Sequence, residues 1–301
     1  MPVTIVGLGE ALFDVFPNGR RKLGGAPLNF AVHAHQLANV SGGRAVPVSR
    51  VGADELGDEV VATLGRFGID TGYIQRDATH PTGQVVVGLS ESGQPRYTIE
   101  SGAAWDFLSF EDRLTELAGT CHAVCFGSLA QRSAQTREAI RLFLSLAKDA
   151  IRFFDVNLRQ NWYDTPTLLD SFGLASAVKL NVEELDVLVD RLGFPKDEGI
   201  HSFFHHFAID YAVLTRGELG TVIYTRANSF EGERARYPEC VNADPVGAGD
   251  ACAAAVTVGL LSHMEPQEVA NAANRVGAFV ASCAGATPAL PPEILGLFRR
   301  S

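Results

Sequence analysis

Apolar runs typical of strands alternate with helical patterns along most of the chain, and this alternation limits the folds that it can adopt. The runs are VTIVGLG (3–9), LNFAVHAHQLA (28–38), HAVCFGSL (122–129), TREAIRLFLSLAKDA (136–150), IRFFDVN (151–157), AVKLN (177–181), VEELDVLVDRLG (182–193) and YAVLTRG (211–217). Because parallel strands are joined by helical crossovers, this order predicts βαβ units and a mostly parallel sheet.

Polar residues stand where three of these strands are expected to end. DVN (155–157), KLN (179–181) and LTRG (214–217) each close an apolar run. Ligands of parallel α/β sheets gather beyond the carboxyl ends of the strands, so these segments are candidates for a binding site.

One stretch interrupts the alternation. QVVVGLSESGQPRYTIE (84–100) contains two strand-like runs around Gly93 and Pro95, which predicts a hairpin. The pattern alone leaves open whether this hairpin decorates an edge or covers a site.

The composition is that of a globular protein with a sizeable core. Of the 301 residues, 46% are hydrophobic and 20% are charged, and the formal net charge is -10. That balance argues against nucleic-acid partners and anionic membranes, which favour a basic face. The N-terminus has the pattern of a first strand rather than a signal peptide, and no apolar run approaches the ~20 residues of a membrane span. We therefore expect a cytoplasmic protein.

The segment ADPVGAGDACAAA (243–255) places a glycine-rich turn before a helix expected from about Asp250 to Leu261. Free N–H groups in a first helical turn attract anions, and Gly247 and Gly249 would leave them accessible. An ionised Asp250 beside such a cradle could accept a proton from an attacking hydroxyl. Taken alone, the segment fits equally well a tight turn in which Asp250 is only a helix cap.

Eight motifs along nearly the whole length decide between these interpretations. They are GEALFD (9–14), GGAPLNFA (24–31), VGADELG (51–57), DVNLRQNW (155–162), KLNVEEL (179–185), LTRGELG (214–220), DPVGAGDA (244–251) and GAT (285–287). With these motifs in this order, the chain resembles the PfkB/ribokinase family of carbohydrate kinases. The resemblance implies a single ribokinase-like domain over residues 1–301, with a Rossmann-like three-layer α/β/α core and a small β-sheet lid. The lid is expected from segments near 12–18 and 84–104.

The resemblance also implies catalytic roles. Asp250 would be the base, and the backbone N–H groups of Gly247, Ala248 and Gly249 would form the anion hole for the transferred phosphoryl group. The positions matched to sugar binding are Asp14, Gly24, Gly25 and Asn29. Arg159 is a candidate for binding oxyanions, with a surface ion pair as the alternative. Tyr97 and Trp105 either face the sugar or pack within the lid, and packing is favoured for Trp105.

The implied cofactors are ATP and Mg2+. The positions matched to the nucleotide are Lys179, Asn181, Thr215, Gly217, Gly220, Asn274 and Ala278, and those matched to metal are Asn181, Glu184 and Asp244. Hard oxygen ligands suit Mg2+. Many relatives bind a monovalent cation near this turn, but Pro245 stands where the family usually has threonine, which leaves a need for K+ open.

The expected activity is ATP-dependent phosphorylation of a sugar hydroxyl, with fructose and its 6-hydroxyl as the first choice. A 2-keto-3-deoxygluconate kinase, a ribokinase and a nucleoside kinase remain alternatives. A non-catalytic sugar-binding module ranks lower because Asp250 and the glycine turn are intact. An NAD-dependent oxidoreductase ranks lower because VGLGEAL (6–12) lacks the third glycine of a dinucleotide fingerprint. The family resemblance leaves a homodimer open.

Overall fold

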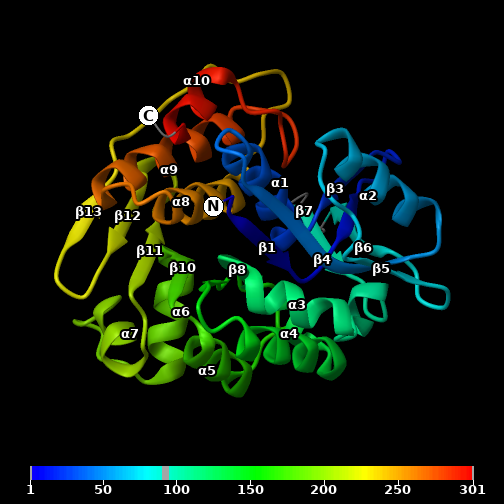
Figure 1. Cartoon of the computed structure of the whole chain (residues 1–301), viewed down its shortest axis with the longest axis horizontal. Helices are drawn as coiled ribbons and strands as arrows, with labels where there is room; N and C mark the ends of the chain where they lie inside the picture. The colour runs from blue at the N-terminus through cyan, green and yellow to red at the C-terminus, as the bar shows by residue number, and fades with distance from the viewer. Residues whose placement is uncertain (1, 90–94, 300–301) are drawn as a thin grey trace.

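The computed structural model describes residues 2–89 and 95–299, and its centre is a mostly parallel sheet (Figure 1). Within this described part, nine strands form the sheet in the order β13-β12-β11-β10-β9-β8-β1-β4-β5. Their bounds are β1 Thr4–Leu8, β4 Arg44–Gly52, β5 Ile74–Asp77, β8 Ala123–Gly127, β9 Ile151–Asp155, β10 Ala177–Asn181, β11 Tyr211–Thr215, β12 Thr221–Tyr224 and β13 Ser229–Glu231. The strands from β11 to β5 are parallel, and β12 and β13 add an antiparallel edge.

Helices cover both faces of this sheet, which confirms the three-layer α/β/α prediction. One face carries α1 (Ala26–Asn39), α8 (Ala248–Leu261), α9 (Pro266–Ala281) and α10 (Pro292–Leu295), as Figure 1 shows. The other carries α3 (Asp112–Thr120), α4 (Ala134–Leu146), α5 (Thr165–Leu174), α6 (Val182–Leu192) and α7 (His201–His206). Short helical turns are η1 Ala104–Phe107, η2 Leu129–Arg132, η3 Gly217–Leu219 and η4 Gly296–Phe298.

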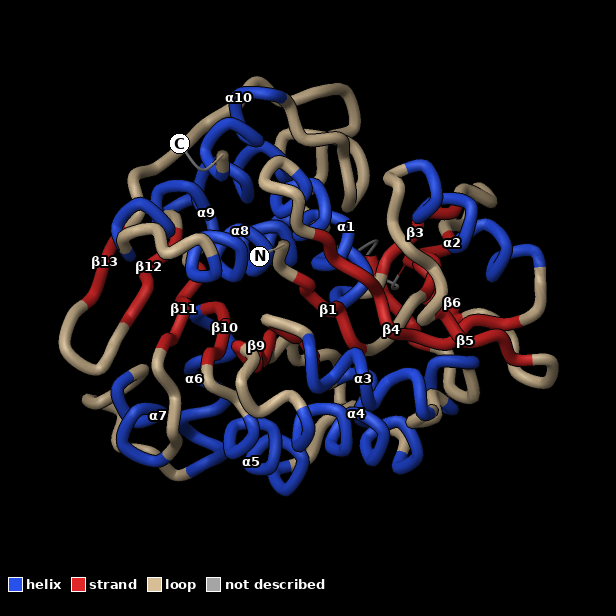
Figure 2. The backbone as a smooth tube through the Cα atoms, in the orientation of Figure 1, coloured by secondary structure: helices blue, strands red, loops and turns tan. Residues whose placement is uncertain are grey.

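A second, four-stranded sheet lies beside the core, in the order β3-β2-β6-β7 (Figure 2). It contains β2 (Leu12–Val15), β3 (Arg21–Gly24), β6 (Gly83–Leu89) and β7 (Pro95–Ile99). The expected hairpin is therefore confirmed, although the middle of its turn falls outside the described residues. Strand β3 was not expected from the sequence, because its four residues carry no apolar alternation.

Helix α2 (Glu55–Arg66) packs next to this small sheet and buries its own apolar stripe. Val60 and Leu64 of α2 contact a cluster that includes Phe13 of β2 and Leu28 of α1. The small sheet is thus fixed to the core on one side by hydrophobic contacts, which stabilise its position next to the N-terminus of α1.

The strand order creates a natural site for ligands. The chain passes from β1 to β4 on one side, and β8 later pairs with β1 on the other side. The carboxyl end of β1 therefore lies at a switch point, where the connections diverge and leave room between them. In the part of the chain that the structure describes, no helix is long and apolar enough to cross a membrane.

Candidate active site

The glycine turn before α8 is built by backbone geometry that excludes side chains. Gly247 is the N-cap of α8 and has φ 84°, in the left-handed region that favours glycine. A Cβ atom on Gly247 would lie 2.2 Å from the carbonyl oxygen of Ala286. The helix begins at Ala248, two residues earlier than expected, so that Asp250 lies in its first turn.

The amide groups of this turn are not equivalent. The N–H of Ala248 donates a 3.1 Å hydrogen bond to the carbonyl of Pro245 and is used within the turn itself. The amides of Gly249 and Asp250 belong to the first helical turn, where no preceding carbonyl of the helix is available to accept from them. The Ala248 N–H is thus used within the turn in this structure, and the anion hole of Gly247, Ala248 and Gly249 stays a prediction.

Asp250 is held by a residue from the other end of the chain. The side-chain amide of Asn29, in α1, donates a 2.9 Å hydrogen bond to Oδ2 of Asp250. Burial, and then the charge of Asp155, raise the pKa of Asp250 to about 6. Lys179, Asn29 and Arg159 act in the opposite direction and favour the ionised form. A carboxylate with this pKa is suited to accept a proton near neutral pH.

A buried ion pair lies beneath the turn. Lys179 at β10 donates a 2.7 Å hydrogen bond to Oδ1 of Asp155 at the end of β9. Burial lowers the pKa of Lys179, but the neighbouring charges of Asp155 and Glu184 outweigh it and the net shift is upward. The Lys179 ammonium lies 3.4 Å from where a Cβ of Gly249 would stand. A permanent positive charge therefore lies directly under the first turn of α8.

Glu10 is a second buried carboxyl group at this site, and it was not among the predicted residues. It follows β1 and is 2% exposed, and its Oε1 accepts a 3.3 Å hydrogen bond from the N–H of Ala26. Burial raises the pKa of Glu10 to about 7, and the charge of Asp250 adds to this rise. Within the described residues, Oε2 of Glu10 has no hydrogen-bond partner.

The predicted sugar-binding residues Gly24, Gly25 and Asp14 lie close to Glu10 and to one another. Gly25 is the N-cap of α1, and a Cβ there would lie 2.4 Å from the carbonyl of Glu10. Gly24 is near Asp14, since a Cβ on Gly24 would lie 3.4 Å from Oδ2 of Asp14. Burial raises the pKa of Asp14, and Lys22 and Arg159 oppose that rise.

Arg159 is exposed in the loop after β9 and interacts electrostatically with Glu10, Asp14 and Asp250. Nη1 of Arg159 donates a hydrogen bond to the carbonyl of Leu158, at 3.3 Å. The alternative of a surface ion pair finds no support, because none of the ion pairs of the described residues includes Arg159.

Asn181 and Glu184 form a capping box at the start of α6. Oδ1 of Asn181 accepts from the N–H of Glu184 at 2.8 Å, and Oε2 of Glu184 accepts from the N–H of Asn181 at 2.9 Å. Oε1 of Glu184 accepts from the N–H of Leu158 at 2.9 Å. Within residues 2–89 and 95–299, no group of three or more His, Cys, Asp or Glu side chains is arranged to hold a metal ion. The side-chain oxygens of Asn181 and Glu184 thus accept from backbone N–H groups, and their role in holding a metal stays a prediction.

Asp244, the third position matched to metal, stands apart from that pair. Its Oδ2 forms an ion pair with the ammonium of Lys22, from β3. The two halves of the predicted metal set thus lie on different elements, with the capping box at α6 and Asp244 at the start of the glycine turn.

The residues matched to the nucleotide form a wall beside α9. Gly217 begins η3 with φ 57°, and Gly220 follows it with φ 83°. Oδ1 of Asn274 accepts from the N–H of Thr221 at 2.8 Å, and Nδ2 donates to the carbonyl of Glu233 at 2.9 Å. Because its amide is used on backbone groups, Asn274 shapes this wall by joining α9 to β12.

Thr215 and Ala278 are the two other residues matched to the nucleotide in this region. Thr215 ends β11, and its hydroxyl donates to the carbonyl of Leu180 at 3.5 Å. Ala278 lies half-buried on α9, one residue after Gly277, whose Cβ position is 3.4 Å from the carbonyl of Ala248. The wall thus begins directly beside the glycine turn.

The two aromatic candidates differ. Trp105 is 1% exposed, and the Arg132 guanidinium stacks 4.0 Å from the centre of its ring, so packing is its role. Tyr97 pairs with Val87 through the backbone of β7 and β6. The side chain of Tyr97 falls outside the described residues.

Comparison with known proteins identifies the family. Residues 15–293 match the model of the pfkB family of carbohydrate kinases. The chain belongs to this family. A fructokinase of Klebsiella pneumoniae is 32% identical to this pfkB kinase over 304 aligned positions, which cover 94% of this chain and 95% of the relative.

Solved structures show the same fold. A fructokinase of Xylella fastidiosa with bound ATP superimposes with a TM-score of 0.84 at 24% identity, covering 98% of this chain and 97% of that one. An Escherichia coli protein described as a candidate ribokinase II, in complex with ATP and Mg2+, gives 0.83 at 20% identity and covers all of both chains. At these identities the structural likeness establishes only the fold of this pfkB kinase.

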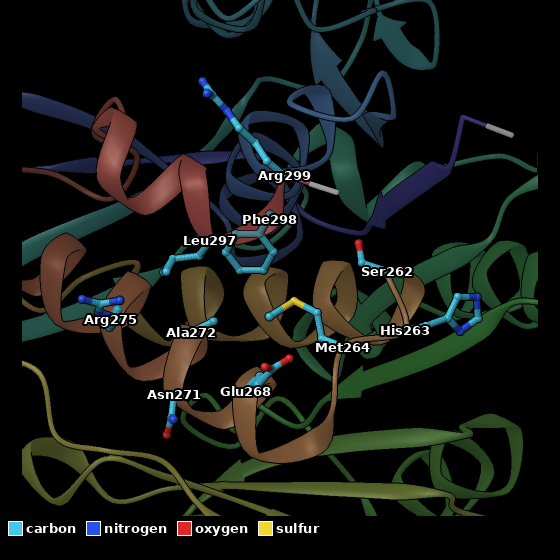
Figure 3. A pocket seen from close by; sticks show the side chains of 10 residues that line it. All are labelled: Ser262, His263, Met264, Glu268, Asn271, Ala272, Arg275, Leu297, Phe298 and Arg299. Atoms are coloured by element: carbon cyan, nitrogen blue, oxygen red, sulfur yellow. The ribbon is translucent and has the colours of Figure 1, made fainter. Parts of the chain in front are cut away.

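A cavity of about 550 Å3 lies elsewhere on the pfkB kinase (Figure 3). It is formed between α9 and the C-terminal segment, by residues that include Met264, Glu268, Arg275 and Phe298. None of the predicted site residues lines it, so this cavity is separate from the candidate active site.

The structure adds two charged residues that the sequence predictions missed, Glu10 and Lys22, and it pairs Asp155, from the DVN segment at the end of β9, with Lys179. Glu10 could have been found, because it is an acidic residue at the carboxyl end of a parallel strand. Lys22 carries no comparable signal.

Proposed function

We propose that this pfkB kinase transfers the γ-phosphoryl group of ATP to the 6-hydroxyl of fructose, and that Asp250 is the base. The observation that carries the proposal is the position of Asp250, in the first turn of α8 beside the glycine turn and hydrogen-bonded to Asn29. The fructokinase relatives support fructose as the acceptor.

In this mechanism Asp250 takes the proton of the hydroxyl as its oxygen attacks the γ-phosphorus atom. The new O–P bond forms as the bond to the bridging oxygen breaks, and ADP leaves. The pKa of about 6 keeps Asp250 largely ionised at neutral pH while leaving it basic enough to accept the proton.

The surrounding residues orient the reactants and balance charge. The N–H groups at the start of α8, with the Lys179 ammonium beneath them, would stabilise negative charge on the transferred group. Mg2+, when bound, would neutralise charge on the phosphate oxygens. Glu184 and Asn181 would hold its water ligands in place.

The sugar would lie between the small sheet and α1, with Asp14 and Asn29 at its hydroxyls. Carboxylate and amide groups match the donors and acceptors of a polyol. We infer that the small sheet serves as a lid, since excluding water from this space would prevent hydrolysis of ATP.

The test is ADP release with ATP and Mg2+ across fructose, ribose, 2-keto-3-deoxygluconate, tagatose, glucose and adenosine, for the wild type and Asp250→Asn. We expect turnover on fructose that falls by about 10²–10⁴-fold in the variant. If another acceptor is turned over and this turnover depends on Asp250, that acceptor replaces fructose as the proposed substrate and Asp250 remains the proposed base. Undiminished turnover in Asp250→Asn would overturn the assignment of the base.

A further inference from the structure

An ion pair joins the small sheet to the glycine turn. Lys22 lies on β3, and its ammonium contacts Oδ2 of Asp244, 222 positions away along the chain. The two side chains are 23% and 24% exposed. The pair is therefore shielded from solvent on most sides, which strengthens it relative to an ion pair on an open surface.

The second oxygen of Asp244 organises the turn itself. Oδ1 accepts a 3.1 Å hydrogen bond from the N–H of Val246, immediately before Gly247. The N–H of Asp244 donates to the carbonyl of Cys283 at 3.1 Å. Asp244 thus fixes the entrance of the turn, and Lys22 fixes the direction of the Asp244 carboxylate.

The same lysine lies next to the sugar side of the site. Lys22 and Asp14 are direct partners across the antiparallel pair of β2 and β3, so that their side chains share one face of the small sheet. The ammonium of Lys22 also lies 5.7 Å from the centre of the Phe16 ring. A sugar bound at Asp14 would therefore contact the element that carries Lys22.

We propose that Lys22 is a positioning residue that fixes the catalytic turn from the small sheet, through Asp244. Nothing in the motifs of the chain assigns this role to Lys22, and it rests on the proposed function. Lys22 holds Asp244, and Asp244 holds the N–H of Val246 immediately before Gly247, so a sugar bound at Asp14 would stabilise this connection. Sugar binding and nucleotide binding then favour each other through this contact.

The test compares Lys22→Met and Lys22→Arg with a matched control on the same strand. Arg21 also makes ion pairs from β3, but with Glu55 and Glu59 of α2, at 3.2 and 3.3 Å. Arg21→Ala therefore removes a cation from the same strand without touching the glycine turn. All three variants are first checked for wild-type Tm within a few degrees.

The first measurement is hydrogen–deuterium exchange of a peptide covering residues 243–251, without substrates. We expect exchange to be about 10-fold faster in Lys22→Met and near the wild-type rate in Lys22→Arg and Arg21→Ala. Asp244→Asn should reproduce the effect of Lys22→Met, and the double variant should add nothing to it. Unchanged exchange in Lys22→Met would overturn the proposal whatever the substrate proves to be.

The second measurement is the Kd for a non-hydrolysable ATP analogue with and without saturating fructose. In the wild type and Arg21→Ala, fructose should tighten binding of the analogue by about 10-fold, and in Lys22→Met this gain should fall to less than about twofold. The kcat of Lys22→Met should drop by about 10-fold. Because the coupling is reciprocal, its Kd for fructose should change by less than about twofold without nucleotide, but its KM for fructose at saturating ATP should rise by about 5- to 10-fold. An equal gain in Lys22→Met would contradict the coupling. If the wild type phosphorylates none of the sugars, the proposed function fails, and the exchange experiment still decides whether Lys22 holds the turn.

Discussion

The side-chain amide of Asn29 donates a 2.9 Å hydrogen bond to Oδ2 of Asp250, although 221 positions separate the two residues. Asn29 lies in the first part of α1 and Asp250 in the first turn of α8, so the bond joins the N-terminal ends of two neighbouring helices. It fixes one oxygen of Asp250 and lowers its pKa against the effect of burial.

Asn29→Leu should shift the pH dependence of kcat. In the wild type, kcat should rise with pH around the Asp250 pKa of about 6, because the base must be ionised to accept the proton. Removing the amide leaves the ionised form less stable, so the midpoint should move upward by about one pH unit. The measurement is kcat between pH 5 and pH 9.

The control is Gln36→Leu, on the same helix. The Gln36 amide bonds Pro288 and Leu290 and lies away from the site. This variant should lose stability with no shift of the midpoint. An equal shift in both variants would mean that packing of α1, rather than the bond to Asp250, sets the midpoint.

Glu10→Gln should flatten the dependence of stability on pH. Between the ordinary pKa of 4.5 and the native value of about 7, the folded protein keeps a proton on Glu10 that the unfolded chain releases. The free energy of unfolding should therefore fall as pH rises through this window, by about 1.4 kcal/mol per pH unit from Glu10 alone. Urea unfolding at pH 5, 6, 7 and 8 measures the slope.

Glutamine carries no titrating proton, so Glu10→Gln should remove this part of the slope. The exposed Glu183→Gln should keep the wild-type slope. Burial lowers the pKa of His33 to about 4, which makes the free energy of unfolding rise with pH up to about 6.5, so the test is the difference between the two slopes. Equal slopes in the wild type and Glu10→Gln between pH 5 and pH 7 would contradict the raised pKa of Glu10.

Gly247→Ala should damage both stability and catalysis. Its Cβ would meet the carbonyl of Ala286 at 2.2 Å, in addition to the strain at φ 84°. We expect Tm to fall by more than 5 °C, from more than about 2 kcal/mol of destabilisation, and kcat to fall by about 100-fold as the turn shifts.

Gly68→Ala separates the two effects, because Gly68 has φ 71° with nothing within 4 Å of the added Cβ. It should lose about 1 kcal/mol with normal kcat. If Gly247→Ala resembled Gly68→Ala in both measurements, the close packing of the turn would not matter for catalysis.

Glu184→Gln should raise the Mg2+ concentration that gives half-maximal activity by about 10-fold, because a neutral amide holds the water ligands of the metal less strongly. The exposed Glu183→Gln, on the same first turn of α6, should leave the requirement unchanged. Initial rates at saturating ATP over a Mg2+ titration give the comparison. An unchanged titration in Glu184→Gln would remove Glu184 from the metal site.

Asp250, Asn29 and the glycine turn could all be predicted from the sequence, because their motifs are local and occur in a fixed order along the chain. The alternation of apolar runs predicted the parallel sheet for the same reason, because hydrophobic periodicity is a pattern of neighbouring residues in the sequence. The motifs also placed the capping box of Asn181 and Glu184, whose spacing of three residues is a local signal.

The contacts that set the chemistry depend on distance in space. Strand β3 carries no periodic signal, so the ion pair between Lys22 and Asp244 could not be foreseen. Folding removes water from Glu10 and Asp250, which raises the pKa of both groups. It also brings the charge of Asp250 close to Glu10 and the charge of Asp155 close to Asp250, and each of these raises the pKa further. The sequence by itself determined the layers and the glycine turn, since these follow from local patterns, and its motifs pointed to Asp250 as the proposed base. Only the tertiary structure decided which charges are buried together, because charged groups become buried and paired only when distant segments of the chain pack against each other.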